Sequence, residues 1–315
     1  MTFGAGAVYA DWFEPEGDGL ELVDDVRMTA SLELQTATHQ IEKKQGGLTN
    51  ETDYDYSLDL SLEYAVHDRL FLEASAEGDD AGFSLDELAL SASSDDLTIG
   101  WHHGNREVCV CDTAFVSEPL VQLGTWRGDA LYLENESDEL SWRISLLGDW
   151  FEEDKTRQGV DSLRVELHQD AEDQGPFWQF AWQNSGPGDE TDWPDMTREE
   201  SEGAVYALQL GWLNRQNYLA GEWLRYVRRH QGDIQALSLE YLHRLTESWT
   251  FGARLEGSHG AESFPERRYG MLAQWRANER LQLGIVFETG VSGQWPDLGP
   301  VKRYQSAYLT LTLTI

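Results

Sequence analysis

The chain has 315 residues, with 57 acidic against 23 basic side chains and a formal net charge of -34. Phosphate binding needs basic patches, so this charge excludes a nucleic-acid partner. A disordered acidic chain is excluded as well, because 13 Trp, 12 Tyr and 11 Phe supply far more aromatic surface than a solvated tail carries. The two cysteines are too few for a disulfide framework.

No run of about eighteen apolar residues occurs, so no transmembrane helix is predicted. A barrel strand needs only one lipid-facing side, so a barrel sequence stays hydrophilic on average. The mean hydropathy of -0.52 fits that pattern. The first seven residues lack the basic stretch and apolar core of a secretory signal. Either a signal peptide has been removed or the protein is not exported, and we favour removal.

Residues 1–25 form the first predicted unit, a periplasmic or lumen-entering segment. Val8, Ala10 and Trp12 alternate and could form a strand of their own. That strand would make the total odd, whereas bacterial single-chain barrels have an even number of strands.

Alternation is clearest from Tyr54 to Tyr64, where apolar residues at the even positions face Asp, Ser and Glu at the odd positions. A period of two predicts a strand with one apolar side. Aromatic residues stand at both ends, where rings would meet the two boundaries between lipid and water.

Comparable segments follow along the whole chain, some with strong and some with weaker alternation. Gly-rich and Asp-rich breaks come too often for helices of ordinary length. The sequence therefore predicts an all-β fold, a transmembrane antiparallel up-and-down β-barrel of about sixteen strands over residues 26–315. The expected strands are 26–37, 54–64, 69–77, 83–92, 97–103, 129–135, 140–146, 163–168, 178–182, 204–212, 217–226, 233–241, 249–255, 268–275, 281–287 and 307–315.

The connections alternate in length, as expected for short periplasmic turns and longer extracellular loops. The predicted long connections are 38–53, 104–128, 149–162, 184–202, 258–267 and 290–304. The predicted short ones are 65–68, 93–96, 136–139, 213–216 and 276–280. Connections 78–82 and 227–232 are shorter than the rule prefers, and 169–176 is long for a turn.

Charged residues on the polar side of the strands are predicted to line a pore. Carboxylates dominate among them, and a wall of carboxylates concentrates cations and repels anions. Cation preference is one interpretation; the other is that the acidity reflects life in high salt. The predicted pore-lining residues are Asp55, Asp59, Glu63, Glu73, Glu77, Arg143, Arg164, Glu166, Arg254, Glu256 and Glu288.

Connection 104–128 is the third on the side expected to be extracellular, after 38–53 and 78–82, and a general porin folds its third extracellular loop into the lumen. It carries charges of both signs, and rings of charged side chains produce ion selectivity. We predict a constriction there; the alternative is a solvated surface loop. The charged residues are Arg106, Glu107, Asp112, Glu118 and Arg127.

His102, His103, Cys109 and Cys111, with Asp112 beside them, form a group of ligands suited to zinc or copper. Their spacing matches no strong zinc signature, so packing or an incidental thiol pair is the favoured interpretation. No cofactor is expected. Catalytic motifs such as Gly-x-Ser-x-Gly and His-Glu-x-x-His are absent from the sequence, so we do not expect an enzyme.

The stretches Leu85-Asp86-Glu87-Leu88-Ala89-Leu90 and Val116-Ser117-Glu118-Pro119-Leu120-Val121-Gln122-Leu123-Gly124, with Leu97-Thr98-Ile99-Gly100 between them, resemble the legiobactin-uptake (LbtU) family of outer-membrane porins. The resemblance spans about residues 83–150. It implies a barrel that passes siderophores or other small solutes without an energised gate. The run from Trp101 to Arg106 and the Cys109-Val110-Cys111 element depart from the family pattern, so the substrate does not transfer.

The expected function is therefore an outer-membrane porin for small solutes, with preference for cations or metal chelates. Its partners would be outer-membrane lipid and the solutes. Because many sixteen-stranded porins are trimers, a homotrimer is one assembly to expect. Two alternatives stay open, a scaffold barrel that houses a partner protein and a soluble halophilic β-protein.

Overall fold

The computed structural model describes residues 20–314 except 24–25, 45, 68, 80–81, 95–96, 108–124, 136, 138–139, 149–161, 170, 172–173, 185–202, 229–232, 261–265, 279 and 296–298. All regular secondary structure within these ranges is β-strand. No helix in the described part of the chain is long and apolar enough to cross a membrane.

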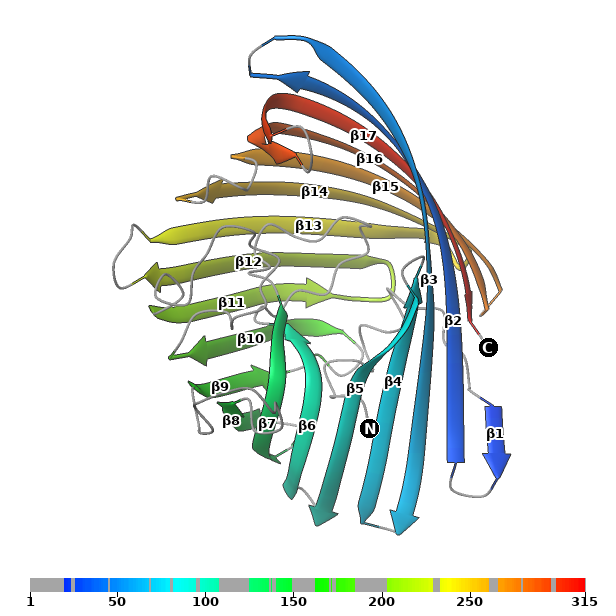
Figure 1. Ribbon diagram of the computed structural model, residues 1–315, viewed down its shortest axis with the longest axis vertical. Coiled ribbons are helices and arrows are strands. Elements are labelled where there is room, and N and C mark those ends of the chain that lie inside the picture. The colour runs from blue at the N-terminus through cyan, green and yellow to red at the C-terminus, as the bar shows by residue number, and fades with distance from the viewer. Residues whose placement is uncertain are drawn as a thin grey trace.

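Sixteen strands, β2 to β17, pair with their chain neighbours in antiparallel fashion, and β17 pairs with β2 to close the ring (Figure 1). The predicted sixteen-stranded antiparallel barrel is confirmed. The strands are β2 (Val26–Lys43), β3 (Leu48–His67), β4 (Leu70–Asp79), β5 (Gly82–Ser94), β6 (Leu97–Glu107), β7 (Thr125–Asn135), β8 (Ser141–Gly148), β9 (Ser162–Gln169), β10 (Gly175–Gln183), β11 (Gly203–Leu213), β12 (Asn217–Arg228), β13 (Ile234–Thr246), β14 (Trp249–His259), β15 (Arg267–Asn278), β16 (Leu281–Trp295) and β17 (Gly299–Thr314).

A seventeenth strand, β1 (Leu20–Val23), pairs with the beginning of β2. It was not predicted, because it lies within the segment expected to stay outside the sheet. Thr314 of β17 is opposite Ser31, and Leu20 of β1 is opposite Met28. Both strands run antiparallel to β2, so β1 continues the line of β17 along the same edge (Figure 1).

Two hairpins extend further than the alternation predicts. β2 and β3 are paired as far as Glu42 and Leu48, so the predicted connection 38–53 shortens to 44–47. Likewise β16 and β17 replace the predicted connection 290–304 with 296–298. A strand beyond the lipid needs no apolar side, so its ladder of backbone hydrogen bonds continues where the sequence pattern stops.

The two ends of the barrel differ in their connections. At one end the strands are joined by 68–69, 95–96, 136–140, 170–174, 214–216, 247–248 and 279–280, which are all short. The opposite end carries the three longest connections, 108–124, 149–161 and 184–202. We call the first the short-turn end. The last residues of β17 and the short strand β1 both lie at the short-turn end. The first and the last described residues of the chain are therefore at the same end of the barrel.

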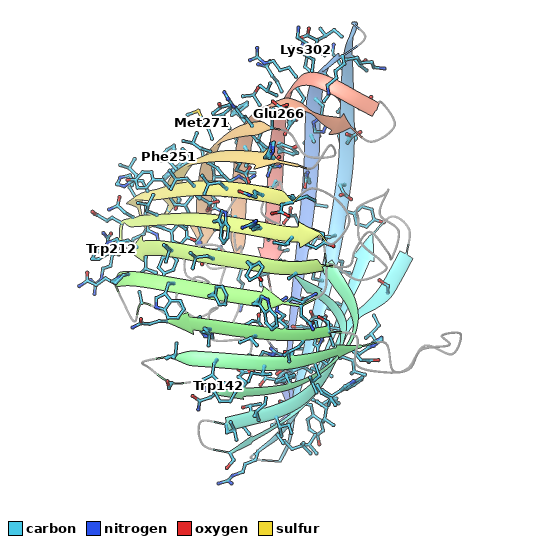
Figure 2. All side chains as sticks on the ribbon, turned by 90° about the vertical axis from the view of Figure 1, so that its left-hand side faces the viewer. Trp142, Trp212, Phe251, Glu266, Met271 and Lys302 are labelled. Atoms are coloured by element: carbon cyan, nitrogen blue, oxygen red, sulfur yellow. The ribbon has the colours of Figure 1, made fainter. Side chains whose placement is uncertain are left out.

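The outer face of the barrel carries large apolar side chains exposed to solvent. Exposures reach 58% for Leu237, 59% for Phe287 and 68% for Met271. Figure 2 shows Trp212, Phe251 and Met271 projecting from the outside of the sheet. Such an exposed apolar surface is far larger than the patches of soluble monomers. It is the surface expected of a barrel embedded in lipid.

The apolar band has the height of a bilayer core. Tyr54 and Tyr64 stand on the outer face of β3, exposed by 83% and 38%. Ten residues of strand span roughly 33 Å, which a tilt of about 40° reduces to about 25 Å across the membrane. On the same outer face, near the short-turn end, Trp249 packs beside Phe251 and Trp275. Aromatic rings therefore mark the boundary at which a lipid layer would end.

Candidate pore lumen

The inner face of the barrel carries the charged residues that alternation predicts. Each of them whose side chain is described pairs across the strands with residues of the same face. That face is the one turned away from the exposed apolar side chains. The charged residues on it are Asp55, Asp59, Glu63, Glu73, Arg143, Arg164, Glu166, Arg254, Glu256 and Glu288. Glu77 lies in β4 opposite Asp59 in the register, and its side chain is outside the described part.

An ion-pair cluster joins β14, β15 and β16 on this wall. Arg254 contacts Glu288 at 3.0 Å and Glu256 at 3.2 Å. Arg268 of β15 contacts the same Glu256 carboxylate. All four residues are less than 9% exposed. Because each guanidinium holds a neighbouring carboxylate, this part of the wall is close to electrically balanced and presents little net charge to the lumen.

A second cluster joins β7, β8 and β9. Arg143 is opposite both Glu134 and Glu166 in the register, and its guanidinium carbon lies 3.7 Å from the centre of the Tyr132 ring. A cation over an aromatic face is stabilised by the ring quadrupole. In the same cluster Arg164 donates a hydrogen bond to Glu166 at 2.7 Å. Here too the arginines are buried among their partners rather than open to the lumen.

The wall formed by β3 differs from both clusters, since its carboxylates are open to water. Asp53, Asp55 and Asp59 are exposed, and the Asp53 side chain keeps 64% of its surface accessible. Asp53 lies 3.3 Å from Nε2 of His39, whose Nδ1 hydrogen-bonds Oγ of Ser306 at 2.8 Å. The carboxylates of β3 are therefore accessible on the inner face, while Arg143, Arg164 and Arg254 are buried.

The predicted constriction lies mostly outside the described residues. Asp112 and Glu118 fall in 108–124, which the structure does not describe. Arg106 and Glu107 belong to β6 and Arg127 belongs to β7, so these three are strand residues rather than loop residues. The connection between β6 and β7 is therefore shorter than the predicted 104–128, because the two strands stay paired as far as Glu107 and Thr125.

The two histidines of the predicted metal group lie on opposite faces of β6. His102 is 8% exposed on the inner face, 3.6 Å from Glu87, whereas His103 faces outward and contacts Asp129 at 3.0 Å. Adjacent residues of a strand point to opposite faces, so the two imidazoles do not converge. Cys109 and Cys111 are outside the described residues. Among those that are described, no group of three potential metal ligands occurs.

An apolar belt on the inner face was missed by the sequence reasoning. Its members are cross-strand neighbours that run from the short-turn end of β11 across the wall to β17. The belt consists of Leu213, Tyr218, Leu242, Gly252, Leu272, Val286 and Tyr308. The ring of Phe177 stacks on Tyr218 at 5.7 Å. The sequence reasoning missed the belt because it expected polar residues at inward positions, whereas Leu272 and Val286 are apolar there.

Comparison with known proteins rests on structure alone. No protein-family model matches the chain. A search of curated proteins also found no match. Among solved structures, Salmonella typhi OmpF in complex with daunomycin superposes with a TM-score of 0.65 at 12% identity, over 94% of this chain and 100% of that one.

Two further solved structures give the same result. Pseudomonas putida OprB at high pH has a TM-score of 0.65 at 8% identity, covering 94% of this chain and 96% of that one. A triple mutant of Rhodopseudomonas blastica porin has a TM-score of 0.61 at 11% identity, covering 92% and 100%. Identities this low establish the architecture and not the cargo. The chain has the fold of the sixteen-stranded porins.

Proposed function

We propose that this protein is an outer-membrane porin through which small solutes diffuse, with preference for cations. The observation that carries the proposal is a closed sixteen-stranded ring with an exposed apolar outer face and charged residues on its inner face. A soluble β-protein would have to hide that outer face, and an open sheet would leave edges that lipid cannot satisfy.

Cation preference is supported by the contrast between the walls. Carboxylates on β3 are exposed to the lumen, whereas Arg143, Arg164 and Arg254 are at most 3% exposed and lie beside carboxylates. A low-dielectric channel with an acidic lining attracts counter-ions. Mobile ions would therefore experience mainly the charge of β3.

The test is the reversal potential of single channels in a planar bilayer under a salt gradient. We expect the intact protein to favour cations, and the triple exchange Asp53→Asn, Asp55→Asn and Asp59→Asn to lower the ratio of cation to anion permeability severalfold. Ser57→Asn with Ser61→Asn is the matched control, because it alters the same inner face without changing its charge. Anion preference of the intact protein would overturn the selectivity, and absence of any conductance would overturn the pore itself.

Metal chelates are the narrower class of cargo that we propose, on the strength of the resemblance to legiobactin-uptake porins. An acidic lumen suits chelates that carry net positive charge. A cationic ferric hydroxamate chelate should produce brief blocks of the current, and the same chelate with aluminium in place of iron should behave alike if shape and charge decide entry. A chelate that neither blocks nor permeates would limit the cargo to simple ions.

A homotrimer is the assembly that we propose by analogy with the porin fold. Cross-linking in native membranes, followed by electrophoresis without heating, should give a band three times the mass of the chain. A monomeric band alone would reject it.

A further inference from the structure

Positive charge on the outer face of the barrel gathers at one end. Among the strand residues whose side chains the structure describes, the outward lysines and arginines are Arg225, Arg267, Lys302 and Arg303. All four lie at the end opposite the short-turn end, where the three longest connections also lie. In a chain with 57 acidic and only 23 basic residues, the cations of the outer face are thus placed at one edge of the apolar band.

Arg267 and Arg303 lie in one row of the outer face, two strands apart. In the register Arg267 is opposite Val291, and Val291 is opposite Arg303. Neighbouring strands are about 4.8 Å apart, so the two arginines are separated by about 10 Å of backbone, and both side chains can reach one group placed over Val291. Both are exposed, and neither has an ion-pair partner within the part of the chain that the structure describes.

A β-bulge adds a third cation to this row. The register between β17 and β2 shifts between Val301 and Arg303, and a bulge sets two residues of one strand opposite one residue of its partner. Lys302 and Arg303 are both exposed, whereas Val301 is buried. Lys302 contacts Glu42, the residue opposite Arg303, at 2.9 Å. We call Arg267, Lys302 and Arg303 the cationic row; against the one carboxylate it keeps two uncompensated positive charges.

Arg267 lies where the hydrocarbon layer would end. On β15 it is eight residues from Trp275, which belongs to the aromatic boundary near the short-turn end. Eight residues of strand span roughly 27 Å, which a tilt of about 40° reduces to about 21 Å, close to the roughly 25 Å of an apolar band. The headgroups of that leaflet would therefore lie at the height of the cationic row.

The outer face becomes less polar with each row below the cationic row. The first row toward the membrane centre consists of Tyr269, Thr289 and Gln305, and the second consists of Met271, Phe287 and Ala307. Met271 and Phe287 are 68% and 59% exposed. Charge is thus followed by hydrogen-bonding groups and then by apolar surface. A phosphorylated lipid presents its phosphate, its polar linkage and its acyl chains in the same order.

We propose that the cationic row binds a phosphate group of a lipid in the outer leaflet, whose acyl chains lie on Met271 and Phe287. Guanidinium groups suit this ligand because they donate two parallel hydrogen bonds to phosphate. A phosphate monoester carries close to two negative charges at neutral pH, which matches the two uncompensated positive charges. The lipid of this chemistry in a Gram-negative outer leaflet is the phosphorylated, multiply acylated disaccharide lipid A. The proposal rests on the outer-membrane location proposed above, but not on conduction.

The test is the equilibrium binding of fluorescently labelled lipid A to the immobilised protein in neutral detergent. We expect Arg267→Gln with Arg303→Gln to raise the dissociation constant at least about tenfold, since one charge-assisted hydrogen bond is worth about that factor. Arg225→Gln is the matched control. It removes an outward arginine at the same end whose charge Asp233 already neutralises, so binding should stay unchanged.

Three outcomes would overturn the proposal. The first is equal binding of lipid A by the intact protein and by the double variant, with heat-modifiable gel mobility showing that both are folded. The second is equal binding of lipid A and of its dephosphorylated form by the intact protein, because acyl contacts alone would then explain retention. The third is full displacement of lipid A by an equal concentration of inorganic phosphate, which would assign the row to a free anion.

Single-channel conductance of the same proteins separates this site from the pore. The cationic row lies on the outer face, so the double variant should conduct as the intact protein does. If no protein conducts while the difference in lipid binding persists, the porin function fails and the lipid site stands. If conductance is normal and the difference in binding is absent, the lipid site fails and the porin stands.

Discussion

Arg254 links two carboxylates of the ion-pair cluster on β14, β15 and β16. It is 1% exposed and lies between Glu256 and Glu288. Removing one partner of a buried ion pair costs about 3–5 kcal/mol, because the remaining charge stays away from water. We therefore expect Arg254→Met to lower the free energy of unfolding by about 3 kcal/mol, measured by urea denaturation in detergent micelles.

Arg225 offers the matched control. It pairs with Asp233 on the outside of the barrel, where the two side chains are 43% and 30% exposed. Exposed pairs contribute at most about 1 kcal/mol, so Arg225→Met should have little effect. If both variants lost the same free energy of unfolding, burial of the Arg254 ion pairs would not explain their contribution to stability. Adding Glu288→Gln to Arg254→Met should restore part of the stability.

Glycines under aromatic rings shape the inner wall at single positions. The Phe177 ring lies over its cross-strand partner Gly211, where a Cβ atom would come within 2.0 Å of the ring. The Tyr304 ring covers its partner Gly290 in the same way, at 2.1 Å. Both rings lie flat on the wall because the partner has no side chain. The sequence contains all four residues but cannot pair them, since the pairing depends on register.

Strands that face water on one side and lipid on the other could be predicted from the sequence. In β3, the run Tyr54 to Tyr64 alternates without error, and the structure places its even positions outside. The first residues of β3 from Leu48 escaped prediction, because beyond the lipid only backbone pairing defines a strand. The apolar belt escaped for the opposite reason, since Val286 and Leu272 are apolar on the face where polarity was expected.

Leu60 tests the assignment of lipid to the outer face at the level of one strand. It is on the outer face of β3, near the middle of the band between Tyr54 and Tyr64. An arginine at the bilayer midplane costs about 2–4 kcal/mol in a barrel. We expect Leu60→Arg to lower the unfolding free energy in lipid vesicles by that amount, and to have a smaller effect in detergent.

The control for Leu60 is on the same strand. Ser57 points into the lumen between Asp55 and Asp59, so Ser57→Arg places a cation beside two carboxylates and should cause no loss. Equal destabilisation by the two arginines would mean that β3 does not separate lipid from water.

Ring closure is a property of the whole molecule, and the sequence gives no direct sign of it. An even number of strands allows closure, but an open sheet could have the same alternation. The ladder between β17 and β2, from Val301 opposite Lys43 to Thr314 opposite Ser31, is what removes both edges. A closed ring has no structural beginning, so the position of the chain ends should matter little once every strand has both neighbours.

A circular permutant tests that conclusion. Because β1 continues the line of β17, residue 315 joined through one serine to Leu20 would make a single strand along β2. New ends opened at 95–96 lie at the same short-turn end as the natural ones. We expect the permutant to refold from urea into detergent with the β-sheet circular dichroism and the heat-modifiable gel mobility of a linear chain that lacks residues 1–19. That linear chain is the control for the loss of the segment. If it folds while the permutant stays unfolded, the ladder between β17 and β2 is not equivalent to the others, and the ring depends on a seam that forms last.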